Sequence, residues 1–500
     1  MPTEGATTGS VWASGAGPRP LRPRFVWTAD SGASGYEIEL DDSCANASSC
    51  DFPSPEVHEH PTEPSFIPSQ DLPVSMTPPV GRRYYWRVRA CYATGCSTWS
   101  RTGYLEVGRQ RQDFNGDGYA DLAIVAGGVT RNAVFVYLGG PQGITTVGWS
   151  DRGGDAVGFG FSRALWAGDL NGDGFSELAT VVNSAAGDAI RFYAGGAAPG
   201  VTPLYETTAA SSAPVTVIWP QAAGDLNGDG HADVVWMSLG QDAQGSPTAA
   251  YQAAYGKTST PVLSAAEHVA STADVVSCDY DSDGFADLIG TTAGGTLGVF
   301  HGGGDGPFSG AATPLSIVGG WPLVCAANVN GRGGASILSS NAGALFLQSS
   351  GVPPGTSACD GPIPIGSVGG GSTPAADGGD TDGDGFEDLI VGDSSNNRAA
   401  LLFGGCPASR VLELPGQSDQ GGTPQAGYSV AGGGDLDGDG FPDFAVGNPY
   451  AGIDSFCSGE VYVYAGGPAA SAVPAVVLTD PDGGGVAGSC TGDGFGASVD

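Results

Sequence analysis

The chain has 500 residues, including 86 glycines and ten cysteines, and a formal net charge of −35. Charged side chains make up 14% and hydrophobic ones 40%, which is not the composition of a disordered acidic chain. The negative charge disfavours binding to nucleic acid or to an anionic membrane, because both require a basic surface. The glycines follow no period of three, which excludes collagen, and their abundance predicts many short strands joined by tight turns.

The first 107 residues fall into two parts. Residues 1–17 are rich in Gly, Ala, Thr and Ser, and we expect them to form a linker. From 18 to 107, short runs of alternating apolar and polar residues are separated by Gly, Ser and Pro, which predicts an antiparallel sandwich. This segment resembles a fibronectin type III module, with Trp27 as the core tryptophan, Tyr84 at the corner position, and Ser97-Thr98-Trp99-Ser100 near the last strand.

From residue 108 onward, one Asp-rich motif returns every 49 to 56 residues. A fixed period of this size indicates a repeat architecture. The motif places side-chain oxygens at positions one, three, five and nine of a nine-residue turn, with a carbonyl oxygen at position seven and glycine at position six. Hard oxygen ligands of this kind are those that Ca²⁺ prefers, and glycine permits the sharp turn. The motifs begin at Asp113, Asp169, Asp225, Asp279, Asn328, Asp380 and Asp435.

Six of these motifs carry the full ligand set, so we predict about six structural Ca²⁺ ions. The first three have Asn at position three, and the second ends in Glu, so we expect them to bind more weakly than the three all-Asp motifs. The predicted ligands are Asp113, Asn115, Asp117, Tyr119 and Asp121; Asp169, Asn171, Asp173, Phe175 and Glu177; Asp225, Asn227, Asp229, His231 and Asp233; Asp279, Asp281, Asp283, Phe285 and Asp287; Asp380, Asp382, Asp384, Phe386 and Asp388; and Asp435, Asp437, Asp439, Phe441 and Asp443.

The fifth motif, which begins at Asn328, is different. It has Arg332 at position five and Ser336 at position nine. A guanidinium at the centre of a cation site would prevent binding, so we predict no ion in this motif. We expect Arg332 to bond the Asn side chains or backbone carbonyls in place of the ion.

The motif begins like an EF-hand loop, but it lacks the Glu at position twelve and the exiting helix. It is followed instead by a short apolar strand, such as Phe444-Ala445-Val446, and later by a second strand that usually ends in Gly-Gly. Roughly four strands fit each unit, as a propeller blade requires.

The repeats resemble the FG-GAP (VCBS-like) repeats of integrin α-subunit propellers. Gly158-Phe159-Gly160-Phe161-Ser162 and Gly494-Phe495-Gly496-Ala497-Ser498 match the motif that names the family, and Ala426-Gly427-Tyr428-Ser429 is a weaker copy. The resemblance covers residues 108–500. It implies an all-β fold with a propeller of about seven four-stranded blades, in which the calcium loop joins the first and second strands of a blade.

The ten cysteines are even in number and show no CxxC zinc spacing, which favours disulfides and an oxidising compartment. Successive pairing is the simplest arrangement, although the spacing leaves the connectivity open. Met1-Pro2-Thr3-Glu4 begins no signal peptide, so we expect that a leader was removed or lies upstream of a secreted or cell-surface protein. The absence of an 18-residue apolar run predicts no membrane insertion within this segment.

No catalytic residues are predicted, because the sequence contains no GxSxG, HExxH, P-loop or dinucleotide fingerprint. Metal-assisted hydrolysis would need an open coordination position and a base, whereas these loops are of a closed, structural kind. The resemblance therefore implies a binding protein, not an enzyme, that acts in adhesion or surface recognition of a protein or glycan ligand. The alternatives are a carbohydrate-binding, lectin-like propeller and the non-catalytic module of a secreted hydrolase.

Overall fold

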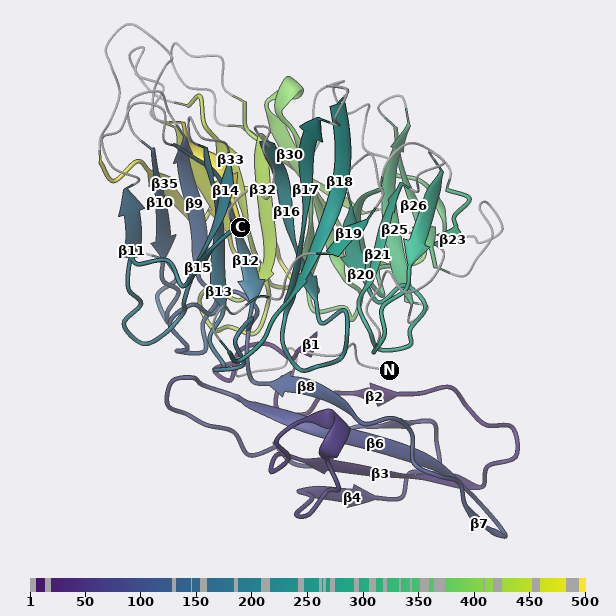
Figure 1. Ribbon diagram of the computed structural model, residues 1–500. Coiled ribbons are helices and arrows are strands. Elements are labelled where there is room, and N and C mark those ends of the chain that lie inside the picture. Colours follow the sequence, from purple (N-terminus) through teal and green to yellow (C-terminus); the bar gives the residue numbers. More distant parts are fainter. Residues whose placement is uncertain are drawn as a thin grey trace, which may run out of the picture.

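The computed structural model contains β-strands and two short 3-10 helices, η1 (Ala47–Ser49) and η2 (Ser394–Asn396), and no α-helix in the part of the chain that it describes (Figure 1). The described residues are 6–13, 19–127, 132–144, 146–152, 160–183, 188–207, 216–241, 247–259, 263, 267–269, 275–291, 296–304, 312–317, 322–331, 334–341, 344–350, 359–363, 374–407, 410–416, 425–451, 459–482 and 494–500.

Eight strands from the first 107 residues form a sandwich, called the N-terminal sandwich below. They are β1 (Ala6–Thr7), β2 (Phe25–Val26), β3 (Gly35–Asp41), β4 (Val57–Glu59), β5 (Ser65–Phe66), β6 (Arg82–Tyr92), β7 (Gly95–Cys96) and β8 (Gly103–Val107). One sheet has the order β1-β8-β6-β3-β4, with β7 paired to β6, and the other pairs β2 with β5.

Side chains from both sheets of the sandwich share one core. Trp27 lies in this core with Ile38 and Leu105, as expected for the predicted core tryptophan. Tyr84 is also buried there, and its hydroxyl donates a hydrogen bond to the Pro73 carbonyl at 2.6 Å.

The segment predicted to be a linker differs in part from that expectation. Its residues Ala6–Thr7 form strand β1, which pairs in parallel with β8 of the sandwich. Ser10 and Trp12 contact the rest of the protein through hydrogen bonds to the carbonyls of Gly118 and Asp117. Composition alone could not show this, because the hydrogen bonds that hold β1 come from β8, which is distant in sequence.

The rest of the described chain forms seven four-stranded antiparallel sheets, an all-β and propeller-like arrangement. Each from its first strand, they are β36 (Phe495–Val499), β9 (Leu122–Gly127), β10 (Asn132–Tyr137) and β11 (Val147–Arg152); β12 (Gly160–Gly168), β13 (Glu177–Asn183), β14 (Ala189–Tyr193) and β15 (Tyr205–Glu206); β16 (Thr216–Gly224), β17 (Asp233–Gln241), β18 (Pro247–Tyr255) and β19 (Glu267–Val269); β20 (Val276–Cys278), β21 (Asp287–Thr291), β22 (Leu297–Phe300) and β23 (Thr313–Pro314); β24 (Pro322–Ala327), β25 (Ala335–Asn341), β26 (Ala344–Ser349) and β27 (Gly361–Pro362); β28 (Ala375–Gly379), β29 (Asp388–Asp393), β30 (Arg398–Leu402) and β31 (Val411–Pro415); and β32 (Ser429–Gly434), β33 (Asp443–Asn448), β34 (Glu460–Tyr464) and β35 (Val476–Thr479).

The seven sheets close into a ring. The first strands β12, β16, β20, β24, β28, β32 and β36 each contact the next, and β36 contacts β12. Strand β36, from the C-terminal end of the chain, pairs with β9, so the first sheet is built from both ends of the repeat region. Seven hydrophobic clusters fill the spaces between neighbouring sheets, and one of them joins the first sheet to the last. Burial of these apolar faces is the main force that holds the sheets together.

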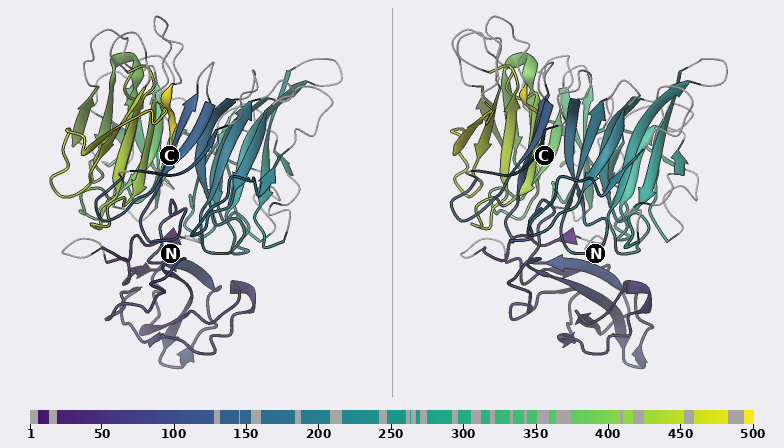
Figure 2. Two further views of the ribbon diagram at one scale, coloured as in Figure 1. Left: turned by 90° about the vertical axis from the view of Figure 1, so that its left-hand side faces the viewer. Right: turned by 60° about the vertical axis from the view of Figure 1, so that its left-hand side comes forward.

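The N-terminal sandwich lies at one end of this ring, and the additional views agree on its position (Figure 1, Figure 2). The FG-GAP-like motif at 494–498 falls on strand β36, and the one at 426–429 leads into β32. Of the third motif, residues 158 and 159 lie outside the described part, while residues 160–162 begin β12.

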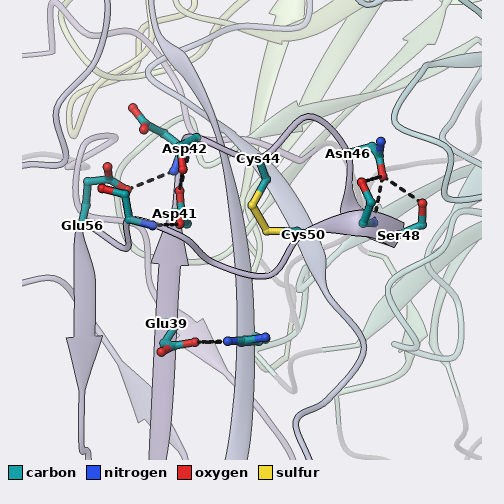
Figure 3. The surroundings of a disulfide bond; sticks show 12 residues. Glu39, Asp41, Asp42, Cys44, Asn46, Ser48, Cys50 and Glu56 are labelled. Carbon is teal, nitrogen blue, oxygen red and sulfur yellow. Dashed lines mark hydrogen bonds and ion pairs between the residues drawn. A yellow bond between two sulfur atoms is a disulfide. The ribbon is translucent and has the colours of Figure 1, made fainter.

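Four disulfides follow the successive pairing considered above: Cys44–Cys50, Cys91–Cys96, Cys278–Cys325 and Cys359–Cys406. The first brackets η1 at the edge of the sandwich (Figure 3). The third joins the first strands of two neighbouring sheets, β20 and β24. Cys457 and Cys490 lie outside the described residues.

The disulfides are compatible with an extracellular protein. In the described part of the chain, no helix has the length and apolar character needed to cross a membrane.

Candidate metal centres

The seven Asp-rich motifs form seven loops, which we number in chain order: loop 1 (113–121), loop 2 (169–177), loop 3 (225–233), loop 4 (279–287), loop 5 (328–336), loop 6 (380–388) and loop 7 (435–443). Each of loops 2 to 7 connects the first and second strands of its sheet, as the resemblance implies. Loop 1 leads into the second strand β9, because the first strand of that sheet is β36.

The six loops with complete motifs share one hydrogen-bond frame. In each, the carboxylate at position one accepts a hydrogen bond from the glycine N–H at position six, at 2.8 to 3.1 Å. The side-chain oxygen at position three accepts from the N–H at position five. The carboxylate at position five accepts from the N–H at position seven. These bonds bring the side chains of alternate residues to the inside of one turn.

The carboxylate at position nine ties each loop to its sheet. One oxygen accepts a hydrogen bond from the N–H at position two, at 2.7 to 2.9 Å. The other accepts from the N–H of a glycine that follows the third strand, at 2.7 to 3.4 Å. This glycine is the first of a Gly-Gly pair in five of the loops, whereas in loop 3 it is Gly256, which precedes Lys257. This explains why the motif and the Gly-Gly pair recur together. In loop 2 the bond to Gly195 is the longest, 3.4 Å, where Glu177 replaces Asp.

The loops also contact one another around the ring, through positions that supply no side-chain ligand. The position-four glycine of one loop lies against the position-seven side chain of the next: a Cβ on Gly383 would lie 2.5 Å from Cε1 of Phe441. The same contact closes the ring between Gly438 of loop 7 and Tyr119 of loop 1. Backbone hydrogen bonds also join neighbouring loops, as the Ala120 N–H of loop 1 donates to the Asp435 carbonyl of loop 7 at 3.0 Å. His231 takes part in the same way, with its ring against Gly172.

One link of this ring lacks the aromatic contact, and the sequence changes on both sides of it. Loop 5 has Gly334 at position seven, so no ring faces loop 4. At position four of loop 4, Ser282 replaces the usual glycine and adopts φ 61°. The left-handed conformation is therefore tolerated without glycine, and it is the neighbouring ring that requires glycine at the other loops.

Burial and mutual repulsion raise the proton affinity of the loop carboxylates. Burial is the main cause and a neighbouring carboxylate adds to it: the pKa of Asp113 and of Asp279 rises to about 7, and that of Asp435 to about 6. The pKa values of the position-nine groups Asp121 and Asp443 are well above the usual range for the same reasons. Carboxylates held this close favour a bound cation, which offsets their repulsion.

Unpaired oxygens give an independent test of whether a cation fits. Oδ1 of Asp279 and Oδ1 of Asp380 are buried and have no hydrogen-bond partner among the described residues. In loop 4, the oxygens of Asp279, Asp281 and Asp283 lie within 4.8 Å of one another. The residues present therefore fit a hard divalent cation.

Two basic side chains that the motif does not include lie at position-three carboxylates of the loops. In loop 4, Nδ1 of His301 is 2.9 Å from an oxygen of Asp281. In loop 6, Arg410 forms an ion pair with Asp382. Both acidic partners stand at position three, so two of the three all-Asp loops carry a basic group at a predicted ligand. His301 directly precedes the Gly-Gly pair, a place taken by apolar or Tyr residues in the other complete repeats, which is the signal that sequence reasoning could have used.

The described residues of loop 5, 328–331 and 334–336, carry no carboxylate. Gly331 adopts φ 74°, as the position-four glycines do elsewhere. Asn330 donates a hydrogen bond to Ser349 instead of facing a carboxylate. Ser336, at position nine, is buried and its hydroxyl has no partner among the described residues. Arg332, predicted to replace the ion, lies outside the described residues.

Beside the loops, a cavity of about 560 Å³ lies where the first strands meet strand β1. Its lining includes Arg83, Arg109 and Arg111 together with Asp377 and Glu387. Burial and repulsion from Asp377 raise the pKa of Glu387 well above its usual range. The lining also includes Glu106 and the position-one carboxylates of loops 2, 3, 4, 6 and 7, so acidic side chains outnumber basic ones in this cavity.

Comparison with known proteins gives one family match. The family model described as FG-GAP repeat matches residues 426–464, which contain loop 7 and strands β32 to β34. No curated protein matches the chain. Among solved structures, a glucose dehydrogenase is 14% identical and covers 53% of this chain and 90% of its own, with a TM-score of 0.31. The soluble aldose sugar dehydrogenase from Escherichia coli is 13% identical and covers 57% and 96%, with a TM-score of 0.29. A eukaryotic initiation factor is 11% identical and covers 94% and 90%, with a TM-score of 0.22.

Proposed function

We propose that this chain is an extracytoplasmic binding protein built on a seven-bladed, calcium-stabilised FG-GAP-type propeller that carries a fibronectin-type sandwich. The single observation that carries the proposal is the shared frame of the six loops, which repeats the same convergence of acidic side chains six times around one ring. Positions one, three, five and nine would hold each Ca²⁺, together with the carbonyl at position seven. The ion would supply charge neutralisation and cross-linking within the loop, and no catalytic step is assigned to it.

The site chemistry favours a structural ion over a catalytic one. The side-chain oxygens that face the turn are already fixed by backbone N–H groups, and the two histidines at these loops, His231 and His301, lie against the carboxylates of Asp229 and Asp281. The function is then recognition of a surface protein or glycan by the propeller, and a net charge of −35 argues against nucleic acid as the partner.

Calorimetric titration of metal-free protein with Ca²⁺ tests the metal part of this proposal. We expect about six ions to bind and the melting temperature to rise, since a ligand that binds only the folded state adds about 2.7 kcal/mol at a hundredfold excess over its Kd. Absence of binding, or seven ions instead of six, contradicts the assignment of the loops. A glycan and surface-protein array, with and without Ca²⁺, then tests the recognition part, and a glycan-only profile would favour the lectin alternative.

A further inference from the structure

The N-terminal sandwich packs directly on the loops that we assign to Ca²⁺. Three of its hydrogen bonds go to backbone carbonyls of the loops: Arg83 donates to the Gly230 carbonyl at 2.7 Å, Arg101 to the Asp283 carbonyl at 3.1 Å, and the Val80 N–H to the Gly116 carbonyl at 2.9 Å. Loops 1, 3 and 4 are therefore bonded to the sandwich. No hydrogen bond, ion pair or ring contact joins loop 6 to the described residues of the sandwich.

Tyr104 makes the contact closest to a predicted ligand. Its hydroxyl donates a hydrogen bond to Oδ2 of Asp225, the first ligand of loop 3, at 2.7 Å. The same oxygen accepts the Gly230 N–H at 2.9 Å, and Oδ1 accepts the Gly228 N–H at 2.6 Å. Tyr104 itself is only 2% exposed, so its ring and hydroxyl are held in place by the sandwich. A donor fixed in this way favours the ionised carboxylate in one orientation.

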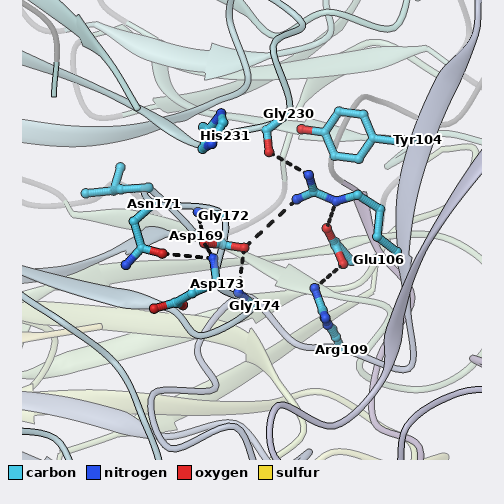
Figure 4. Close-up of polar contacts among 12 residues, drawn as sticks. Tyr104, Glu106, Arg109, Asp169, Asn171, Gly172, Asp173, Gly174, Gly230 and His231 are labelled. Carbon is cyan, nitrogen blue, oxygen red and sulfur yellow. Dashed lines mark hydrogen bonds and ion pairs between the residues drawn. The ribbon is translucent and has the colours of Figure 1, made fainter. Parts of the chain in front are cut away.

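Figure 4 shows Tyr104 and Glu106 close to Asp169 and Gly230 in the same interface, and Arg83 contacts all four of these residues. It forms an ion pair with Glu106 and lies over the Tyr104 ring, 4.4 Å from its centroid. One guanidinium nitrogen also lies 4.0 Å from Oδ2 of Asp169, the first ligand of loop 2. Burial alone would raise the pKa of Glu106, but Arg83 and Arg109 outweigh it and hold this pKa below its usual range. The interface is thus a connected set of charges that spans loops 2 and 3.

We propose that the sandwich serves as an intramolecular clamp for the calcium loops, with Tyr104 as a positioning residue of loop 3, so that Ca²⁺ binding and sandwich docking stabilise each other. This inference rests on the proposed calcium function. Coupling between two binding events is reciprocal: if docking orders loop 3 for Ca²⁺, then Ca²⁺ strengthens docking by the same factor. Loop 6, which the sandwich does not contact, should bind its ion independently.

Hydrogen exchange of the full chain, followed by mass spectrometry over a Ca²⁺ titration, tests this loop by loop. In Tyr104→Phe, we expect the midpoint of protection for the peptide carrying residues 225–233 to move to about three- to tenfold higher Ca²⁺, because a hydrogen bond to a charged group is lost. The midpoint for residues 380–388 should not move. Tyr92→Phe is the matched control, since its hydroxyl also bonds a carboxylate, Asp30 at 2.8 Å, but within the sandwich.

The unmodified protein provides a second readout that needs no variant. Adding Ca²⁺ should protect the β8 amides, Gly103–Val107, although that strand contains no predicted ligand. If no loop gains protection with Ca²⁺, the calcium assignment itself is wrong. If all six loops gain protection but Tyr104→Phe shifts them equally or not at all, and β8 is unaffected, the clamp is refuted while the calcium assignment stands.

Discussion

The contact between neighbouring loops offers the sharpest test of how the ring is held together. Gly383 in loop 6 adopts φ 76°, and a Cβ there would overlap the Phe441 ring of loop 7. Gly383→Ala should therefore cost about 1–2 kcal/mol for the left-handed backbone and about 1–3 kcal/mol for the steric overlap. Phe441→Ala removes a half-buried ring and should cost about 1.5–3 kcal/mol.

The double variant separates these two terms. With the ring gone, the overlap disappears, so Gly383→Ala combined with Phe441→Ala should be about 1–3 kcal/mol more stable than the sum of the single changes predicts. Urea unfolding in saturating Ca²⁺, followed by tryptophan fluorescence, measures the three free-energy changes. Neither substitution removes a ligand, because position seven contributes only its carbonyl, so the number of bound ions should stay the same.

Loop 4 supplies the control for this cycle. Ser282 occupies the equivalent position with a positive φ and faces Gly334, which has no side chain. Ser282→Ala should change the stability by no more than about 0.5 kcal/mol. If the changes at Gly383 and Phe441 simply add within about 0.5 kcal/mol, the packing of ring on glycine does not constrain the loops, and our explanation of the recurrent glycine fails.

Three further predictions follow from the site. Without Ca²⁺, the carboxylates of Asp113, Asp279 and Asp435 have folded-state pKa values of about 6 to 7, against an ordinary value of 3.8. The folded state then binds more protons than the unfolded state, so the free energy of unfolding in chelator should fall as the pH rises from about 4 to 7. Urea unfolding at a series of pH values measures this fall, and saturating Ca²⁺ should abolish it. Arg410→Met should strengthen Ca²⁺ binding at loop 6 by about two- to fivefold in a calorimetric titration, because it frees Asp382 from its ion pair. Arg398→Met is the control: it removes ion pairs to Asp393 and Glu413, which are not predicted ligands, and should leave all Ca²⁺ affinities unchanged. Alkylation of native protein should leave the eight cysteines of the described disulfides unlabelled, and removal of the Cys278–Cys325 bridge, with a sequence separation of 47, should cost about 4 kcal/mol.

The sequence was informative wherever the physical constraint is local. The ligand spacing of the loops lies within nine residues, so each loop could be located and its turn predicted from the motif alone. Successive cysteine pairing is confirmed for the four described bridges. The strand after each loop could be predicted from its short apolar run, as with Phe444-Ala445-Val446, which lies in β33.

What the sequence did not indicate depends on contacts between distant residues. His301 and Arg410 lie outside the nine-residue motif, and only the third strand or the loop after it brings them to the carboxylates. The predicted order of Ca²⁺ affinity, with the three all-Asp loops as the strongest, is therefore incomplete. Two of these three loops carry a basic group at a predicted ligand, and loop 7 has no such group among the described residues. The sequence shows that Ser282 and Gly334 both depart from the repeat. It does not show that the two departures are related, because only the structure places position four of one loop against position seven of the next.

The position of the sandwich also constrains how calcium can influence recognition. Hydrogen bonds from the sandwich occupy the carbonyls of Gly116, Gly230 and Asp283, so these loops face protein instead of a partner. If the loops hold Ca²⁺ as we propose, the ion would act on a binding surface indirectly, by fixing neighbouring sheets to one another through the ring of loops. Binding that survives chelation while the ring remains folded would place the partner on the strands or loops away from this end. Binding that disappears on chelation before the ring unfolds would instead place a partner contact at a loop to which the sandwich is not hydrogen-bonded, such as loop 6.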